Sequence, residues 1–177
     1  MKVRLTHIDG KLPNLALMKL AHWHRSRGDE VFLSRFPTPH LFEPHCDRVY
    51  ASSIFDWSQQ KVAQCKIAFP DAITGGTGMD NWEQLPTVEQ VTGESTYEHY
   101  DYSLYPEYPW SIGFTARGCR LSCKFCVVPK KEGKPRSVNT LWDIWREGTP
   151  RNIHLLDNDF FGQPEQEWKS RLAEARE

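Results

Sequence analysis

The stretch Val3-Arg4-Leu5-Thr6-His7-Ile8-Asp9-Gly10 decides the fold class, because a short apolar strand pattern ends there in a turn signal. Residues 3–7 predict a strand, and Asp9-Gly10 interrupts it. Pro13 can open a helix at its first turn. The apolar side chains that follow have the spacing of a helix buried on one side. They are Leu15, Leu17, Met18, Leu20, Ala21 and Trp23.

The same alternation continues through the first hundred residues. Gly28 ends the first helix, and residues 30–33 predict a second strand. Two more strands are expected at 48–52 and 71–74, separated by a helix at 58–66. Strands that alternate with helices predict a mostly parallel sheet with helices on its faces. We therefore expect an α/β chain whose residues 1–96 form a Rossmann-like domain.

Two loops of this region follow strands and are candidates for ligand contact, since ligands of such sheets lie beyond the carboxyl ends of the strands. These loops are Asp9-Gly10 and Gly75-Gly76-Thr77-Gly78. Glycines can approach a phosphate or a ring closely. Glycines that only shape a turn are the more frequent case, and the second loop does not identify a ligand by itself.

The composition changes between residues 97 and 109, where tyrosines accompany prolines and disfavour a helix. The residues are Tyr97, Tyr100, Tyr102, Tyr105, Tyr108, Pro106 and Pro109. We predict an ordered linker with a domain boundary near Pro109. Its rings fit packing between domains better than a platform for stacking a base.

Residues 110–177 again alternate between strand and helix patterns. Strands are expected at 111–115 and 152–156. A helix follows Thr140 to about Glu147, with Asp143 placed for a capping box, and another begins at Pro164. This βαβα order predicts the opening of a barrel or of a second sheet.

The segment Gly118-Cys119-Arg120-Leu121-Ser122-Cys123-Lys124-Phe125-Cys126 carries the chemistry of this region. Its spacing is Cys-x3-Cys-x2-Cys, and cysteine thiolates are the ligands that hold iron–sulfur clusters. Three close cysteines can ligate three of the four irons of a cubane cluster. The fourth iron then stays open or takes a distant ligand. We therefore expect a [4Fe–4S] cluster on Cys119, Cys123 and Cys126.

The charge of the same region fits a cluster. Seven basic residues and one acid, Glu132, give the segment 117–136 about +6, against a net charge of −1 for the chain. The basic residues are Arg117, Arg120, Lys124, Lys130, Lys131, Lys134 and Arg136. Positive charge stabilises a reduced cluster, and Phe125 is placed to exclude water from it. A solvated basic loop is the simpler interpretation of the charge run taken alone.

Zinc is the main alternative metal, but a structural zinc site takes four protein ligands. The fourth would be Cys46, Cys65 or a histidine such as His154, and the local spacing supplies none of them. The odd count of five cysteines and their clustering argue against a disulfide framework. Three unligated cysteines in eight residues are the least favoured interpretation.

The loop resembles the signature of the radical S-adenosylmethionine superfamily, Cys-x3-Cys-x-aromatic-Cys, with Phe125 at the aromatic position. The resemblance implies that the three cysteines ligate a [4Fe–4S] cluster whose open iron binds S-adenosylmethionine. One electron from an external donor of the flavodoxin or ferredoxin type then yields a 5′-deoxyadenosyl radical. That radical takes hydrogen from a substrate, which is unknown here. The chain would thus be an enzyme whose cofactor supplies the difficult chemistry.

Further segments are similar to an uncharacterised group of bacterial and phage radical proteins with an N-terminal domain like those that bind cobalamin. They are Gly75-Gly76-Thr77-Gly78, Asp101-Tyr102-Ser103-Leu104-Tyr105-Pro106, Phe125-Cys126-Val127-Val128-Pro129 and Leu155-Leu156-Asp157-Asn158. The cobalamin motif Asp-x-His-x-x-Gly is not matched by His7-Ile8-Asp9-Gly10, so bound cobalamin is not expected.

The superfamily's Gly-Gly-Glu element, which helps to bind the methionine amino group, is replaced here by Asp157-Asn158-Asp159. The resemblance makes Asp157 and Asp159 candidates for that contact. Capping of the following turn is at least as good an interpretation of each carboxylate.

The length of the second region limits the barrel. A complete eightfold barrel takes roughly 200–250 residues, and residues 110–177 hold two strand–helix units. We expect a truncated barrel, a fragment, or a barrel completed by a partner chain. A non-catalytic or electron-transfer iron–sulfur protein is therefore the first alternative function, and a zinc-stabilised interaction module is the second.

The sequence also indicates where in the cell the protein is located and which partners it lacks. No apolar run approaches the roughly 20 residues of a membrane-spanning helix, and the first residues do not resemble a signal peptide. We expect a cytoplasmic protein without a membrane partner. The net charge of −1 argues against a general nucleic-acid binder.

Overall fold

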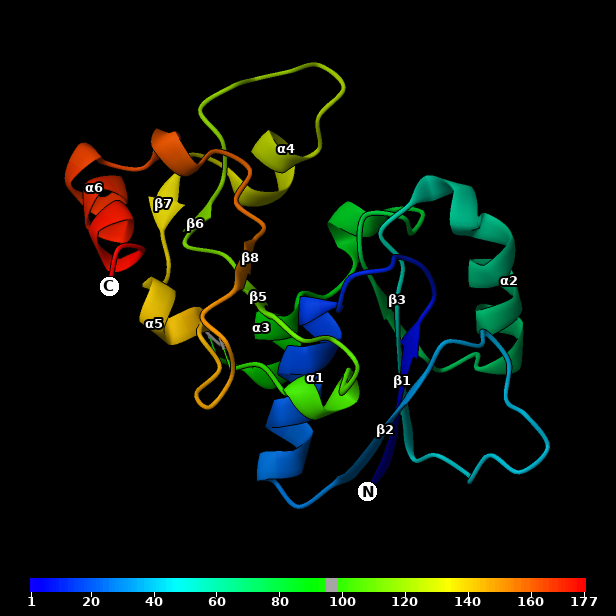
Figure 1. Cartoon of the computed structure of the whole chain (residues 1–177). Coiled ribbons are helices and arrows are strands. Elements are labelled where there is room, and N and C mark those ends of the chain that lie inside the picture. The colour runs from blue at the N-terminus through cyan, green and yellow to red at the C-terminus, as the bar shows by residue number, and fades with distance from the viewer. Residues whose placement is uncertain (95–98) are drawn as a thin grey trace. The chain divides into compact units, whose positions relative to one another are not determined.

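The computed structural model describes residues 1–94 and 99–177. The chain divides into two compact units, Met1–Pro106 and Glu107–Glu177, called unit 1 and unit 2 below (Figure 1). The division lies close to the expected boundary near Pro109. Of the linker expected at 97–109, Tyr97 lies outside the described residues, and the linker role stays a prediction.

Unit 1 contains a four-stranded parallel sheet with the order β2-β1-β3-β4. Its strands are β1 (Lys2–His7), β2 (Glu30–Ser34), β3 (Arg48–Ser52) and β4 (Ile73–Gly75). Five of the six residues of β1 are buried, as in a parallel strand covered on both faces. The predicted α/β class with a parallel sheet is confirmed, and β4 alone is displaced from its expected range.

Three helices accompany the sheet: α1 (Leu15–Ser26), α2 (Gln59–Ala68) and α3 (Val88–Thr92). The side chain of Asn14, and not Pro13, defines the start of α1, because it accepts a hydrogen bond from the Leu17 amide at 3.2 Å. Gly28, with φ of 83°, lies just beyond the end of α1 as predicted. The short helix α3 was not predicted, and the capping box of Thr87 and Gln90 starts it.

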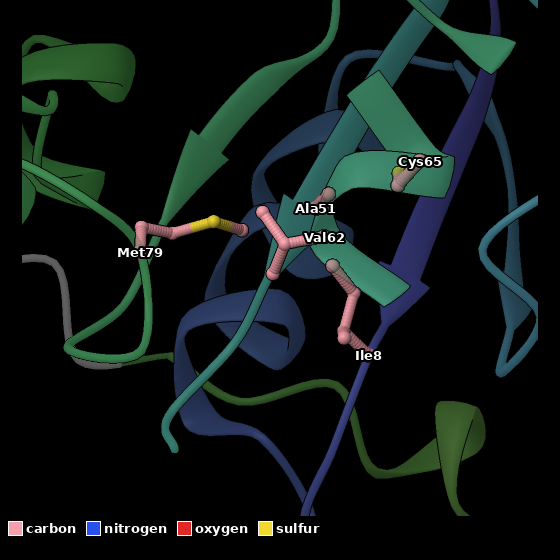
Figure 2. Close-up of a cluster of buried hydrophobic side chains, with 5 residues drawn as sticks. All are labelled: Ile8, Ala51, Val62, Cys65 and Met79. Atoms are coloured by element: carbon pink, nitrogen blue, oxygen red, sulfur yellow. The ribbon is translucent and has the colours of Figure 1, made fainter. Parts of the chain in front are cut away.

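A cluster of buried apolar side chains fixes α2 against the sheet (Figure 2). It gathers Ile8 after β1, Ala51 of β3, and Val62, Cys65 and Met79 from α2 and the loop after β4. Each of these side chains is at most 2% exposed. Burial of this apolar area at about 25 cal/mol per Å² is the main contribution that holds α2 in place.

The glycine loop after β4 packs against protein backbone. Gly76 has φ of 98°, and a Cβ there would overlap the carbonyl oxygen of Ser53. A Cβ on Gly78 would overlap the backbone of Phe55. The amide of Gly78 also donates to the Ser53 carbonyl at 2.9 Å. These glycines therefore serve a close turn, and neither of them lines the cavity described below.

Unit 2 has two small sheets. The strands β5 (Ser111–Gly113) and β8 (Ile153–Leu155) pair in parallel, and β6 (Ala116–Arg117) and β7 (Arg136–Ser137) pair antiparallel. The helices are α4 (Val128–Glu132), α5 (Leu141–Ile144) and α6 (Glu165–Glu174). Buried Ile144 packs α5 against Gly113 of β5, where an added Cβ would lie 3.1 Å from the isoleucine side chain. The parallel pair matches the two strands expected here, and the partial barrel stays a prediction.

The helix expected from Thr140 to about Glu147 is shorter than predicted. The capping box of Thr140 and Asp143 forms, but Trp145 already has extended backbone with ψ of 127°. The Trp145 indole donates to the Thr149 carbonyl at 3.1 Å, and the Arg146 amide donates to the Ser111 hydroxyl at 2.8 Å. These tertiary bonds replace the helical ones and end α5 at Ile144.

Within the described residues, no helix has both the length and the apolar character that a membrane span requires.

Candidate functional site

The cysteine loop of unit 2 leaves and returns through the antiparallel pair of β6 and β7. Ala116 lies opposite Ser137, and Arg117 lies opposite Arg136. Beyond this ladder the Cys119 amide donates to the Gly133 carbonyl at 3.1 Å. Figure 1 shows the long loop that runs from β6 to α4. Both ends of the cysteine loop are therefore fixed, while its middle extends away from the ladder.

Gly118 permits this closure. Its φ of 85° is in the left-handed region, and a Cβ would overlap the backbone carbonyl of Lys134. The residue before the first cysteine can therefore be only glycine without local displacement of the returning chain.

Glu132, which is partly buried, ties the two ends of the loop together. Its carboxylate accepts hydrogen bonds from the Gly118 amide at 2.9 Å and from the Arg117 guanidinium at 3.0 Å. Its side chain is 11% exposed. Sequence reasoning recorded Glu132 only as the one acid of a basic segment and missed this role. Its isolation among seven cations was the available signal.

The three cysteines differ in exposure. Cys123 is exposed, whereas Cys119 and Cys126 are partly buried. The Cys119 sulfur accepts the Leu121 amide at 3.4 Å, and the Cys126 amide donates to the Cys123 carbonyl at 3.0 Å. In the described part of the chain, no three His, Cys, Asp or Glu side chains are placed together so that they could hold a metal ion. The loop thus carries all three thiols but does not gather them.

Phe125 lies on the outside of the loop. Its side chain is 94% exposed, and the exclusion of water from a cluster by this ring stays a prediction.

The two candidate carboxylates have different surroundings. Asp157 follows β8 and accepts hydrogen bonds from the amides of Thr115 and Ala116 at 2.7 and 3.1 Å, and from the Thr115 hydroxyl. It therefore ties the end of β8 to the segment between β5 and β6. This use of both oxygens is a structural role close to the cysteine loop.

Asp159 contacts the cysteine loop itself. It accepts the Arg120 amide at 3.0 Å and pairs with the Arg120 guanidinium at 3.3 Å. Its side chain is 10% exposed. It precedes the 3₁₀ turn Phe160–Gly162 without a side-chain capping bond, so the capping interpretation does not describe it. Asp159 instead orients Arg120, the residue after the first cysteine.

The positive charges of the loop are only partly neutralised. Arg117 pairs with Glu132 and stacks over the Phe114 ring at 3.6 Å. Arg120 pairs with Asp159, whereas Lys124 is exposed. An anionic group bound by the loop would therefore meet at least one cation beside its thiols.

The donor set of the loop fits an iron–sulfur cluster by its chemistry. Three thiols and adjacent amide groups are the ligands and hydrogen-bond donors that such clusters use. The alternative zinc ligands are engaged elsewhere in their own units. Cys65 is a buried residue of α2, and His154 Nδ1 lies 3.0 Å from the Tyr108 hydroxyl.

No protein-family model, no curated protein and no solved structure matches this chain.

Proposed function

We propose that Cys119, Cys123 and Cys126 hold a [4Fe–4S] cluster and that the protein is a radical S-adenosylmethionine enzyme acting on an unknown substrate. The observation that carries the proposal is the Cys-x3-Cys-x-Phe-Cys spacing on one loop whose two ends are fixed by β6, β7 and Glu132. Fixed ends with an accessible middle allow three thiols to converge on one group at little cost to the rest of unit 2.

When bound, the cluster supplies the electron for reductive cleavage of S-adenosylmethionine, delivered by an external donor of the flavodoxin or ferredoxin type. The chain's own residues position the cysteine loop and balance the charge of the cluster. Arg120 and Lys124 offset the negative charge of the thiolates and sulfides. Asp159 holds Arg120 in place, and Asp157 fixes the backbone from which the loop departs.

Asp159 is the better candidate of the two for the amino group of S-adenosylmethionine. In the described part of the chain, the hydrogen bonds that Asp157 accepts come from Thr115 and Ala116, so a cation would have to displace them. Asp159 has its charge shared with a surface arginine, which can move. We propose that β5 and β8 are the first strands of a partial barrel that a further chain segment or partner completes.

The first test is reconstitution with iron and sulfide without oxygen. We expect about four irons per chain and the broad thiolate-to-iron absorption band. Cys123→Ala should remove most of the iron and of the absorption band, because the loop then supplies two thiolate ligands and not three. Cys46→Ala is the matched control, since Cys46 is a partly exposed cysteine of unit 1 and should leave the iron content unchanged.

The second test separates the enzyme from the alternatives. The reconstituted protein is reduced with dithionite in the presence of S-adenosylmethionine, and 5′-deoxyadenosine is measured by chromatography. Product that depends on all three cysteines supports the enzyme. A cluster without product supports the electron-transfer or structural alternative, which the short second region favours. Zinc without iron or sulfide in the purified protein would contradict the cluster and support the zinc module.

A further inference from the structure

A cavity of about 720 Å³ lies at the carboxyl edge of the parallel sheet of unit 1. Three neighbouring strands end at it: β1 is followed by residues 8–12, β2 by Arg35, and β3 by Phe55 and Trp57. This is the edge at which parallel sheets bind ligands, and the volume is in the range of small-molecule sites. Sequence reasoning expected Asp9-Gly10 at this edge, and both residues line the cavity.

Three cations surround the cavity. They are Lys11, Arg35 and Lys61, all of them exposed. Within the described residues, no salt bridge joins any of them to an acid. Arg35 donates to the Gly10 carbonyl at 3.3 Å, which holds the guanidinium beside the loop after β1. Asp9 also lines the cavity, but its carboxylate is turned to the Ser53 hydroxyl and the Ile54 amide. The charge available to a ligand is therefore positive.

An aromatic surface forms another part of the lining. The rings of Phe55 and Trp57 stack at 4.3 Å with 10° between their planes. The Trp57 side chain is 75% exposed. Phe55 supports one face of the indole and leaves surface for another flat ring to stack on. Ile8 belongs both to the lining and to the core cluster of Figure 2, so the cavity floor is continuous with the rigid interior.

His7 adds a polar atom without a partner. The residue lines the cavity and is 1% exposed. Its Nδ1 lies 3.0 Å from the Tyr105 hydroxyl, whereas its Nε2 has no hydrogen-bond partner among the residues that the structure describes. Burial, followed by the charge of Arg35, lowers the pKa of His7 to about 4, so the ring is neutral near pH 7. A buried imidazole nitrogen without a partner is costly to keep, and a ligand atom would compensate for it.

We propose that this cavity binds a mononucleotide-class ligand, with its phosphate among Lys11, Arg35 and Lys61 and its base stacked on Trp57. A phosphate offers a negative charge to three cations that no acid of the described residues neutralises, and a base has the flat apolar face that the exposed indole accepts. The site belongs to unit 1 alone and does not depend on the cysteine loop.

Calorimetric titration of the full chain at low salt tests the proposal, with AMP, GMP, CMP and UMP as probes. We expect saturable binding of at least one nucleotide, with inorganic phosphate and the matching nucleoside each binding more weakly. Trp57→Ala and Lys61→Gln should each weaken that binding roughly tenfold. Both side chains are exposed, so neither change should disturb folding. Lys66→Gln is the matched control, since Lys66 is an exposed lysine on the same helix outside the cavity lining.

Four results of the titrations above would overturn the proposal, and a fifth comes from the cluster variant. They are no saturable binding of any of the four nucleotides, phosphate binding as tightly as the nucleotide, affinity unchanged in both cavity variants, and equal loss in Lys66→Gln. Cys123→Ala should retain full nucleotide binding. Loss of binding in that variant would assign the nucleotide to the cysteine loop and reject the cavity. A failure of the cluster proposal alone would leave the titration unchanged.

Discussion

The two units hold their parallel strands in different ways. In unit 1 the central strand β1 has six residues, and Val3 and Leu5 are fully buried. In unit 2 the paired strands β5 and β8 have three residues each. Carboxylates on backbone amides supplement that small core, with Asp157 beside β5 and Glu132 beneath the cysteine loop. Apolar burial stabilises a scaffold, whereas directed polar bonds fix the place from which a functional loop departs.

Leu5→Ala is expected to have the largest effect and to act on unit 1. Removal of a fully buried leucine from the central strand should cost about 3 kcal/mol of unfolding free energy. Hydrogen exchange read by mass spectrometry should show lost protection in Met1–Pro106 and little change in Glu107–Glu177. Leu41→Ala, at a side chain that is 90% exposed, is the control. Equal loss in both units would mean that the two are one cooperative structure.

A fall in pH should also lower the unfolding free energy of unit 1 before that of unit 2. Burial lowers the pKa of His7 to about 4, and the unfolded histidine titrates near 6.5. The unfolded state therefore takes up the proton first, and stability is lost as the pH falls from about 6.5 to about 4, by roughly 3 kcal/mol for this group. Burial also lowers the pKa values of His22 and His24.

His7→Gln checks this assignment. Urea unfolding of the variant should depend less on pH between 6.5 and 4 than unfolding of the parent. The carboxylates with lowered pKa values, such as Asp9, lose their contribution only below about 3.8 and do not obscure the window. Identical pH profiles for the two proteins would show that His7 does not carry the acid response.

Asp157→Asn tests the polar ties of unit 2. The variant keeps the oxygen that accepts the Thr115 and Ala116 amides but loses its negative charge, and its NH2 group cannot accept the Thr115 hydroxyl, at a cost of about 2 kcal/mol. Exchange should rise at the junction of β5 and β6 and remain unchanged in unit 1. Glu147→Gln, at an exposed acid of the same unit, should be neutral. If the two variants exchange equally, Asp157 does not stabilise the segment from which the cysteine loop departs.

The smallest effect is expected for the N-terminal capping residue of one helix in each unit. Thr87 caps α3 in unit 1 and Thr140 caps α5 in unit 2, each through a capping box. Replacement by Ala should cost about 1 kcal/mol at either site, and Ser should restore most of it. A much larger loss for Thr140→Ala, measured by urea unfolding, would show that α5 does more for unit 2 than α3 does for unit 1.

The same comparison explains what could be predicted from the sequence. The periodic apolar residues of β1 and α1 predicted both elements closely, because burial dictates their spacing. The strands β6 and β7 have two residues each, and Arg117, Arg136 and Ser137 carry no alternation that could indicate them. The end of α5 depends on a bond between Arg146 and Ser111, which are distant in sequence.

The candidate site follows the same rule. Spacing alone identified the three thiols as a donor set, since ligand chemistry needs only residue type and separation. The contacts of Asp157 and Asp159 with Thr115 and Arg120 were not predictable, because they join segments about 40 residues apart. The His7 contact with Tyr105 was missed for the same reason, and so the unpartnered nitrogen of the cavity was missed too.

The buried position of Cys65 makes the reactivity of its thiol a measure of how often unit 1 opens. Cys65 is 1% exposed in the cluster of Figure 2, and burial raises the pKa of its thiol, so it is a poor nucleophile in the folded protein. Cys123 is exposed in the cysteine loop. Alkylation by iodoacetamide should therefore proceed in an early phase on the loop cysteines and Cys46, followed by a slow phase on Cys65 that is limited by the opening of unit 1.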